Sequence, residues 1–300
     1  TYKPMKYNVS AIKNANPLLP PNPGPINVQI YPPNTTTGAP TISQAWFNGC
    51  IEERDTYEIT DYNNVDFSKA LDLNLDLIPS GSDKTQWRPQ FTDLPFARSM
   101  WWDGTGTWTQ ADTDMGSDFL NPTWSGNATC PTTSKRLQTW DTATLGTYVD
   151  SLVADGETYH DIGMIWGGRL ISPTGLFASD NADVNNMPTS RHLIFLTDGI
   201  TQPYDVSYSS YGIEPLDQRR LSIGNIAKLK TTIESRFGVA CAEVKKKNVS
   251  VWVIGFDTTL NKAMTDCAGP GHYFEAKDAA SLANVFSTIA ASMGDLRLAK

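Results

Sequence analysis

Two kinds of hydrophobic pattern alternate along the second half of the chain. Residues 192–196 and 249–256 are almost continuously apolar, as is typical of strands that are covered on both faces. Between them, residues 226–244 repeat apolar positions every three or four residues, and this spacing predicts a long helix. The same reasoning predicts four further helices and a third strand, at 145–152, 162–170, 260–267 and 282–293 for the helices and 273–276 for the strand. Strands and helices in this alternation predict an α/β fold with a doubly wound, mostly parallel sheet and helices on both sides.

The first half of the chain shows few such patterns. Residues 26–30 alternate Ile and Val with polar residues and predict one short strand. Residues 71–77 alternate leucine with aspartate or asparagine and predict a second strand with a polar face. Residues 79–140 are rich in turn residues and tryptophan, which predicts loops. We therefore expect an irregular Pro- and Trp-rich insertion or subdomain over residues 1–140 and an α/β domain over residues 141–300.

Charge and hydropathy exclude some classes of protein. The 300 residues carry a net charge of −8, and the one basic run, at residues 245–247, falls at the end of a predicted helix, where cations are favoured. Proteins that bind nucleic acid need clustered Lys and Arg, so the acidic balance argues against that class. No apolar run in the sequence approaches the length of about 18 residues that a membrane-spanning helix needs.

The four cysteines indicate disulfides. No two of them are spaced as Cys-x-x-Cys, which argues against a zinc site and against a redox motif. We predict two disulfides, one in each half of the chain, with buried free thiols as the alternative. The predicted pairs are Cys50 with Cys130 and Cys241 with Cys267, and the second pair would join the ends of two helices that flank one strand. Disulfides persist in the periplasm or at the cell surface, so we expect an extracytoplasmic protein.

Residues suited to catalysis are scarce. The histidines are His160, His192 and His272, and the sequence has neither a His-Glu-x-x-His zinc motif nor a Gly-x-Ser-x-Gly nucleophile motif. We interpret His160 as a residue of the first turn of its helix. Neither Cys241 nor Cys267 has a histidine placed by the sequence to activate it. We therefore predict that the protein is not an enzyme.

The second half also carries a series of short motifs. A strand ending in Thr-Asp-Gly at 197–199 is followed by a helix, by a strand ending in Ile-Gly-Phe at 254–256, and by Tyr-Phe-Glu-Ala at 273–276. This series resembles a von Willebrand factor A domain. Such domains bind a divalent cation such as Mg²⁺ through an Asp-x-Ser-x-Ser loop, a Thr and an Asp at the carboxyl edge of the sheet. The resemblance implies Thr158 and Asp198 as that Thr and Asp; an alternative role for Asp198 is to cap the turn that follows the strand.

Four longer segments give a closer resemblance. Residues 158–167, 170–175 and 287–300 are similar to the carboxyl-terminal region of TadG-like proteins, and residues 47–54 resemble the cysteine-containing insert of that family. TadG-like proteins are pilus-assembly proteins of bacterial tight-adherence (Flp pilus) systems. The resemblance implies a non-enzymatic surface or periplasmic component of a pilus assembly or adhesion system. Its partners would be other pilus-assembly or cell-envelope proteins rather than nucleic acid.

One part of the cation site is missing from the sequence. No apolar strand ends in Asp-x-Ser-x-Ser, and we interpret the Asp-x-Thr-x-Thr spacing at 103–107, which begins with Asp103, as coincidental because a poor strand precedes it. The Asp-x-Asn-x-Asp spacing at 72–76 lacks the later glycine and glutamate of a calcium loop. We therefore hypothesise that this chain is the carboxyl-terminal part of a longer protein, in which the first strand, its loop and a membrane anchor precede Thr1. A divalent cation would then bind in the intact protein and not in this chain.

Tryptophans of the first half suggest a second function. Exposed indole rings can stack on sugar rings, so the alternative is a glycan- or matrix-binding adhesin module that uses Trp101 and Trp102. In a region with few regular elements, tryptophans more often form the small core that replaces regular packing. We take the core role as the first expectation for these residues.

Overall fold

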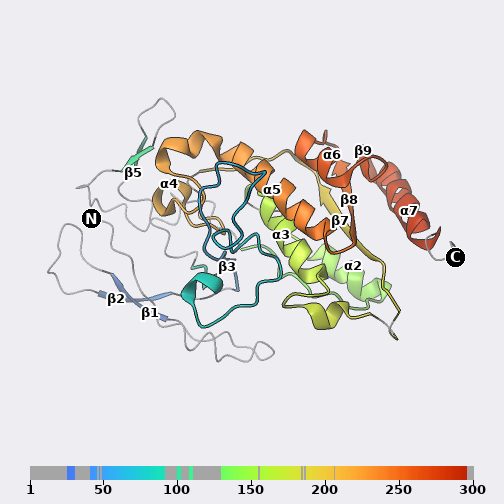
Figure 1. Ribbon diagram of the computed structural model, residues 1–300, viewed down its shortest axis with the longest axis horizontal. Coiled ribbons are helices and arrows are strands. Elements are labelled where there is room, and N and C mark those ends of the chain that lie inside the picture. Colours follow the sequence, from blue (N-terminus) through green and yellow to red (C-terminus); the bar gives the residue numbers. More distant parts are fainter. Residues whose placement is uncertain are drawn as a thin grey trace.

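A computed structural model describes residues 26–30, 41–45, 47, 49–91, 100–102, 108–110, 130–154, 156–183, 185, 187–205 and 207–295. Three short antiparallel pairs belong to the first half: β1 (Ile26–Ile30) with β2 (Thr41–Ala45), β3 (Ile51–Glu52) with β4 (Arg88–Pro89), and β5 (Met100–Trp102) with β6 (Trp108–Gln110). In Figure 1, β1 and β2 lie apart from the helices at the lower left, whereas β5 lies beside α4. The strand predicted at 26–30 is confirmed.

The second half contains a parallel three-stranded sheet. Its strands are β7 (Arg191–Thr197), β8 (Val249–Phe256) and β9 (Tyr273–Ala276), in the order β7-β8-β9. Arg191 pairs with Val249 and Val253 pairs with Tyr273, both in parallel register. The predicted strands and their parallel arrangement are confirmed. The molecule is therefore a mixed α/β protein with a small parallel sheet.

Helices connect and flank these strands, and five of the α-helices lie close to where the periodicity predicts them. The α-helices are α2 (Thr142–Asp150), α3 (His160–Ile171), α4 (Glu214–Asp217), α5 (Leu229–Lys245), α6 (Lys262–Ala268) and α7 (Ala279–Asp295). Three 3-10 helices, η1 (Asp83–Thr85), η2 (Ala178–Asn181) and η3 (Ile223–Lys228), complete the set in the described residues. Asp141 begins α2 because its carboxylate accepts a hydrogen bond from the backbone N–H of Thr144 at 2.9 Å. None of the helices in the described residues is long and apolar enough to cross a membrane.

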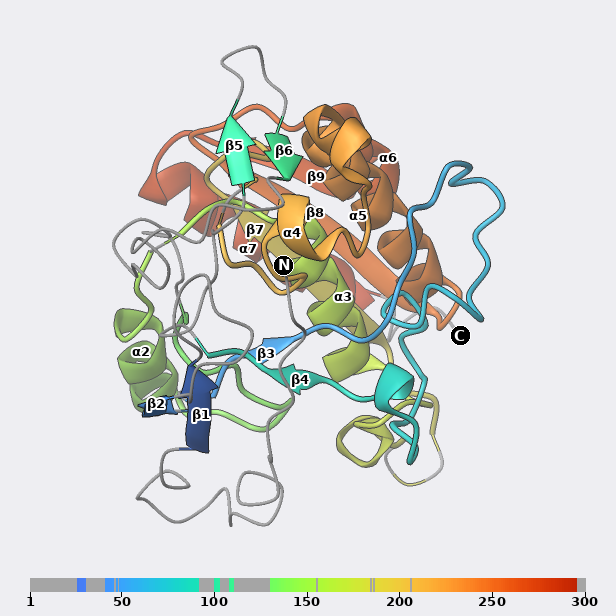
Figure 2. The same ribbon diagram turned by 90° about the vertical axis from the view of Figure 1, so that its left-hand side faces the viewer.

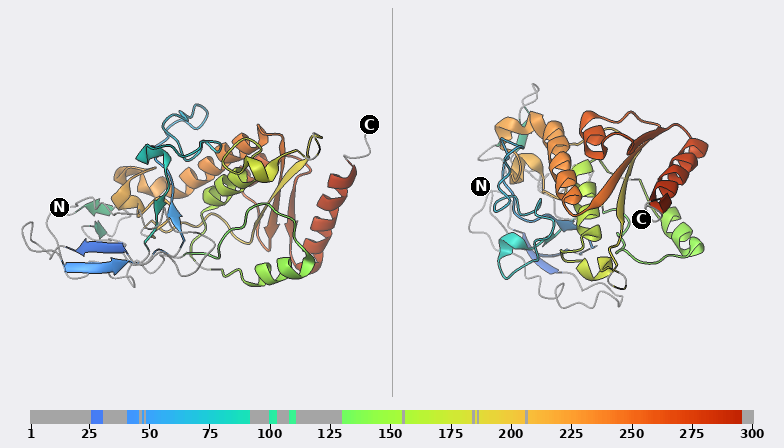
Figure 3. Two further views of the ribbon diagram at one scale, coloured as in Figure 1. Left: turned by 90° about the horizontal axis from the view of Figure 1, so that it is seen from below. Right: turned by 45° about the vertical axis from the view of Figure 1, so that its right-hand side comes forward.

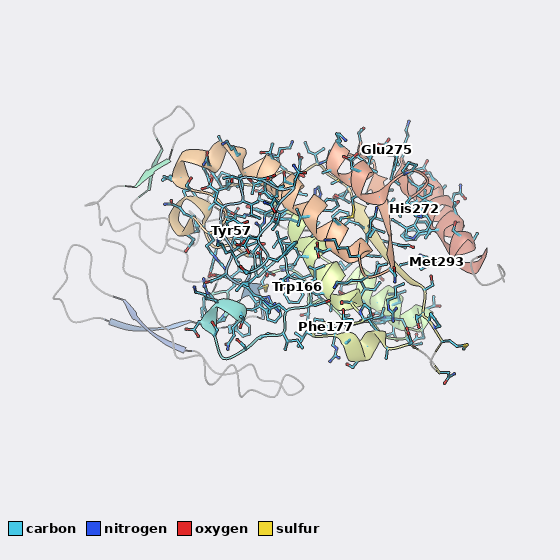
Figure 4. All side chains as sticks on the ribbon, viewed as in Figure 1. Tyr57, Trp166, Phe177, His272, Glu275 and Met293 are labelled. Atoms are coloured by element: carbon cyan, nitrogen blue, oxygen red, sulfur yellow. A yellow bond between two sulfur atoms is a disulfide. The ribbon has the colours of Figure 1, made fainter. Side chains whose placement is uncertain are left out.

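The two faces of the sheet are covered by different helices. On one face, Val253 packs in a cluster with Met164 of α3 and Phe237 of α5. On the other face, Trp252 packs with Ile289 of α7. Figure 3 shows α3 and α5 on one side of the sheet and α7 on the other, and Figure 4 shows His272 and Met293 at the end of the molecule where β9 meets α7. Burial on both faces explains why β8 is apolar almost throughout.

Residues 71–77 form turns, so the strand predicted there is wrong. Leu73 and Leu75 are buried in the cluster beside α3 and α5, and Asp72, directly before Leu73, is fully buried as well. Gly168 of α3 makes room for this segment, because a Cβ at that position would lie 2.8 Å from Cδ1 of Leu75. The alternation of apolar and polar residues therefore reflects a turn that is packed on two sides. One side contacts apolar residues, and the other contacts polar residues that are buried.

Both predicted disulfides are present. Cys50 and Cys130 have their Cα atoms 5.7 Å apart, and Cys241 and Cys267 have theirs 5.8 Å apart, with the sulfur atoms bonded in each pair. The second pair joins α5 to α6, the two helices on either side of β8 in the sequence. The first pair fixes the start of the segment 49–91 to the chain that leads into α2.

Candidate functional site

Thr158 lies against the turn that contains Asp198, at the carboxyl edge of the sheet. Thr158 precedes α3 and pairs with Gln202 through two backbone hydrogen bonds, of 3.1 Å and 3.3 Å. This bridge holds Thr158 against the turn that follows β7, so that its Oγ1 lies 4.0 Å from the position that a Cβ of Gly199 would take. Asp198 stands in the same turn. The two residues that the resemblance implies as cation ligands thus belong to adjoining segments, although 40 positions separate them in the sequence.

Asp198 is exposed, and its carboxylate makes no hydrogen bond or ion pair with the residues that the structure describes. The turn is held instead by Thr197, whose Oγ1 accepts a hydrogen bond from the N–H of Gly199 at 3.2 Å and donates one to its carbonyl at 3.1 Å. Capping of the turn therefore falls to Thr197. The Asp198 carboxylate remains available to solvent or to a partner.

His160 lies beneath this turn as the first residue of α3. Its Nδ1 contacts Oγ1 of Thr201 at 3.0 Å, and its Nε2 contacts Oγ1 of Thr197 at 3.0 Å. Burial lowers the pKa of His160 to about 4, although the nearby negative charge of Asp198 acts in the opposite direction. A buried neutral imidazole with both nitrogens occupied joins α3 to β7 and is poorly placed to act as a base on a ligand in solvent.

Mg²⁺ at this edge would need oxygen ligands beyond Thr158 and Asp198. A further carboxylate, Asp257, follows β8 at the same edge, since Thr197 of β7 lies opposite Gly255 of β8. Its position directly after the apolar run 249–256 is a sequence signal that our prediction did not use. Mg²⁺ requires near-octahedral oxygen coordination and gives up water reluctantly. No group of three or more His, Cys, Asp or Glu residues suited to a metal occurs in the described part of the chain. Asp103 and its loop lie outside the described residues.

A second notable site is a buried cluster of charges between the segment 49–91 and the helices α3 and α5. We name it the buried charge cluster; its four carboxylates and four arginines, each at most 2% exposed, are Glu53, Asp72, Asp161, Glu214, Arg54, Arg169, Arg220 and Arg236. In Figure 2 the segment with β3 and β4 crosses in front of α3, and Figure 4 shows Tyr57 and Trp166 within the dense side chains of this region. The sequence analysis did not predict this cluster.

Direct ion pairs connect most members of the buried charge cluster. Arg169 of α3 binds Glu53 through two hydrogen bonds of 2.7 Å and 2.8 Å. Arg220 binds Asp161 at 2.7 Å and Glu214 at 2.6 Å. Because these charges have partners of opposite sign, the cost of removing them from water is offset in part by the pairing.

Arg236 and Asp72 form the centre of the buried charge cluster. They make an ion pair, and Oη of Tyr211 donates a hydrogen bond to Asp72 at 2.5 Å. Burial alone would raise the pKa of Asp72, but the charge of Arg236 and the Tyr211 hydrogen bond hold this pKa below its usual value. Arg236 follows Ile233 by three positions on the apolar stripe of α5, and a charge at such a position is a sequence signal for a buried ion pair.

Arg54 is the member of the cluster with the least direct pairing. Its guanidinium lies 3.9 Å from the centre of the Trp87 ring, and Trp87 packs against Trp166 with ring centres 5.3 Å apart. Burial, with the neighbouring charge of Arg169, lowers the pKa of Arg54 to about 10. Trp87 is half-buried between Arg54 and Trp166. The side chains of Trp101 and Trp102 lie outside the described residues.

Comparison of the chain with family models, with curated proteins and with solved structures found no match in any of the three.

Proposed function

We propose that this protein is a non-enzymatic component of a bacterial tight-adherence (Flp) pilus assembly or adhesion system, acting at the cell surface or in the periplasm through protein–protein contacts. The observation that carries the proposal is the exposed carboxylate of Asp198, which pairs with no residue of the described part of the chain and lies in the turn against which Thr158 packs, at the carboxyl edge of a parallel sheet. Ligands of open α/β sheets bind at this edge. The arrangement is the one expected of a doubly wound von Willebrand A-like scaffold, and TadG-like proteins supply the pilus context by resemblance.

The side chains at the carboxyl edge of the sheet favour contact with a protein. Asp198 and Asp257 provide negative charge, while Thr158 provides a hydroxyl that can donate or accept a hydrogen bond. A partner with basic or amide side chains would pair with such a surface. A cation shared with a carboxylate of the partner would need ligands beyond those of this chain, in keeping with the hypothesis that a longer protein supplies an Asp-x-Ser-x-Ser loop.

The disulfides support an extracytoplasmic location. Both cysteine pairs are oxidised, and no free cysteine remains. Disulfides are rare in the bacterial cytoplasm and common in the periplasm and at the cell surface. This observation is compatible with an extracytoplasmic protein of the cell envelope.

A deletion strain tests the proposal. Removal of the coding sequence should abolish Flp pili in electron micrographs, and the wild-type sequence should restore them. Complementation with Asp198→Ala should restore few pili at normal protein level, whereas the control Asp266→Ala, an exposed aspartate paired with Lys262 on α6, should restore them fully. Normal piliation in the deletion strain would contradict the proposal. Glycan binding that disappears in the Trp101→Ala/Trp102→Ala variant would instead favour the adhesin alternative.

A further inference from the structure

Two histidines flank Trp252 on the face of the sheet that α7 covers. His192 is the second residue of β7, Trp252 lies in β8, and His272 directly precedes β9. The centre of the Trp252 ring lies 6.2 Å from that of His192 and 4.3 Å from that of His272. Trp252 is 5% exposed and belongs to the apolar cluster under α7, whereas both histidines are half-buried. Protons from solvent can therefore reach the histidines, and the histidines contact the residue on which α7 packs.

The hydrogen bonds of His192 fix its protonation state. The indole Nε1–H of Trp252 donates to Nδ1 of His192 at 3.1 Å. An indole nitrogen is only a donor, so Nδ1 must carry a lone pair and His192 must be neutral. Its proton is then on Nε2, which donates to Oγ of Ser190 at 2.8 Å. Protonation of Nδ1 would place two N–H groups against each other and would break the bond to Trp252.

The surroundings of His192 offer no partner for a positive charge in the described part of the chain. Its side-chain hydrogen bonds there go to Ser190 and Trp252, and none goes to a carboxylate. The charged and titratable groups around it are His272 from the β9 side, Lys135 and Arg136 from the chain before α2, and Arg191 beside it in β7. The aspartates of this region are already engaged, because Asp180 pairs with Arg136 and Asp183 pairs with Arg191. A charged His192 ring would therefore lie among other basic groups.

His272 would add a second positive charge on the other side of Trp252. Its Nδ1 lies 3.3 Å from the carbonyl oxygen of Pro270, and the N–H that donates in this contact is present in the neutral and in the charged ring. Burial lowers the pKa of His192, and the charge of His272 lowers it further. Each ring therefore opposes protonation of the other while both lie against Trp252.

The packing of α7 depends on this tryptophan. The buried cluster under α7 consists of Trp252, Ile254 and Ile289, and the side chains that pack against it include Leu282, Val285 and Met293 of α7. Figure 4 shows His272 and Met293 at the same end of the molecule, where β9 meets α7. The α7 residues of this cluster are all apolar, so they offer no charge to compensate a protonated histidine. A displaced indole would leave the cluster and weaken the contact between α7 and the sheet.

We propose that the hydrogen bond between Trp252 and His192 makes the docking of α7 on the sheet sensitive to pH. At neutral pH the bond holds the indole under α7. At mildly acidic pH, His192 becomes protonated, the bond breaks, and α7 leaves the sheet in a larger fraction of the molecules while the rest of the fold persists. Docking favours the neutral ring, so it is strongest above the ordinary histidine pKa of about 6.5 and weakens as the pH falls below it. His192 lies at the amino end of β7 and Asp198 beyond its carboxyl end, so this inference and the proposed function can fail separately.

Hydrogen exchange on the full chain tests whether α7 opens separately. Protection factors correct the measured rates for the intrinsic pH dependence of exchange, so they report the opening of the structure alone. Amides of α7 should be less protected than those of α5, because α5 packs on the opposite face and is tied to α6 by the Cys241–Cys267 disulfide. Equal protection of α5 and α7 would mean that α7 leaves the sheet only when the whole molecule unfolds, and this result overturns the proposal.

A comparison with His192→Gln tests the pH dependence. The Oε1 atom of glutamine can accept the hydrogen bond from Trp252, but glutamine does not ionise. Between pH 7.5 and pH 5, the protection of α7 should fall at least about fivefold more in the wild type than in His192→Gln, since one net hydrogen bond corresponds to about this factor. His160 and Asp217 titrate alike in both proteins, so they do not contribute to the difference. Equal pH dependence in the two proteins overturns the proposal.

Two further measurements decide the question if His192→Gln is unstable. In nitrogen-15 spectra of the wild type, His192 should be the Nε2–H tautomer at pH 7.5, and the Nε1–H signal of Trp252 should move as His192 titrates. An Nδ1–H tautomer, or a Trp252 signal that stays constant through the titration, overturns the proposal. In His272→Gln, the midpoint of the α7 response should move to higher pH, because the charge that lowers the pKa of His192 is removed. A midpoint at unchanged or lower pH would overturn the assigned repulsion between the two rings.

Discussion

The two sides of the core are stabilised by different interactions. Under α7, Trp252, Ile254 and Ile289 form an apolar cluster without buried charges. Between α5 and the segment 49–91, paired charges are buried instead. A helix satisfies its own backbone hydrogen bonds, so apolar contact is enough to dock α7 on the sheet. The segment 49–91 has few regular hydrogen bonds of its own, so side chains from α3 and the chain before η3 must supply them.

Arginines take the place of strand hydrogen bonds in that segment. Arg169 donates to the carbonyl of Asp72 at 2.7 Å, and Arg219 donates to the carbonyls of Glu53 and Arg54, the latter at 2.8 Å. Irregular chain can thus be buried when charged donors reach its carbonyls, whereas regular elements need only apolar surface. Each of the following predictions tests this contrast or extends it to the carboxyl edge.

The largest effect is expected at the centre of the buried charge cluster. Arg236→Met leaves the buried Asp72 carboxylate without its main partner, and the loss of one member of a buried pair costs about 3–5 kcal/mol of unfolding free energy. Ile289→Val under α7 should cost about 1 kcal/mol, because it removes only one buried methyl group. Urea denaturation measures both values. Similar losses for the two variants would remove the contrast between the two sides.

Removal of the disulfides is expected to have the next largest effect. Replacing both cysteines of a pair with serine should cost about 2–4 kcal/mol. The sequence separations are 80 residues for Cys50–Cys130 and 26 for Cys241–Cys267. Loss of the first pair should therefore cost more, by about 1 kcal/mol, in the chain-entropy account. Urea denaturation of the two double variants gives the order, and a larger loss from the α5–α6 pair would show that helix packing outweighs loop closure.

Low pH should destabilise the folded protein at the carboxyl edge of the sheet, because His160 becomes protonated. Its pKa is about 4 when folded and ordinarily 6.5, so the neutral form is favoured by folding. Its contribution is fully present above pH 6.5 and is lost as the pH falls toward 4, by about 2–3 kcal/mol. Unfolding free energy should therefore fall between pH 7 and pH 4.5, and less so in His160→Gln.

The His160→Gln comparison is needed because another group titrates in the same range. Burial raises the pKa of Asp217 to about 6, which stabilises the folded protein at low pH and loses this effect as the pH rises. Asp217 titrates alike in the wild type and in His160→Gln, so the difference between their pH profiles reports His160 alone. Parallel profiles would contradict the assigned pKa.

The smallest effect is expected from divalent cations. Thr158 and Asp198 are too few ligands for Mg²⁺, so calorimetric titration of this chain should show at most weak binding, with a dissociation constant above about 1 mM. A longer form that includes the hypothesised Asp-x-Ser-x-Ser loop should bind measurably. Tight binding by this chain would contradict the hypothesis of a missing loop, and loss of that binding in Asp103→Ala would identify Asp103 as a ligand.

Local sequence determined the elements of the second half and both cysteine pairs. Apolar runs such as 249–256 and the stripe along 226–244 report burial within one element, and such patterns predict strands and helices without knowledge of the neighbours. The parallel arrangement follows from the alternation of these elements. Thr158 and Asp198 could be singled out as candidates from motifs because each stands next to a recognisable helix or strand.

Only the tertiary structure decided which charges are buried and how residues 71–77 fold. Arg169 and Glu53 are 116 positions apart, and no periodicity in either segment indicates that they pair. Asp72 alternates with leucines as a solvent-facing strand residue would, yet it is fully buried. Its burial is possible because it forms an ion pair with Arg236 and accepts a hydrogen bond from Tyr211. The physical reason is that hydrophobic periodicity is a local property, whereas the compensation of a buried charge depends on partners that the fold brings together from distant parts of the chain.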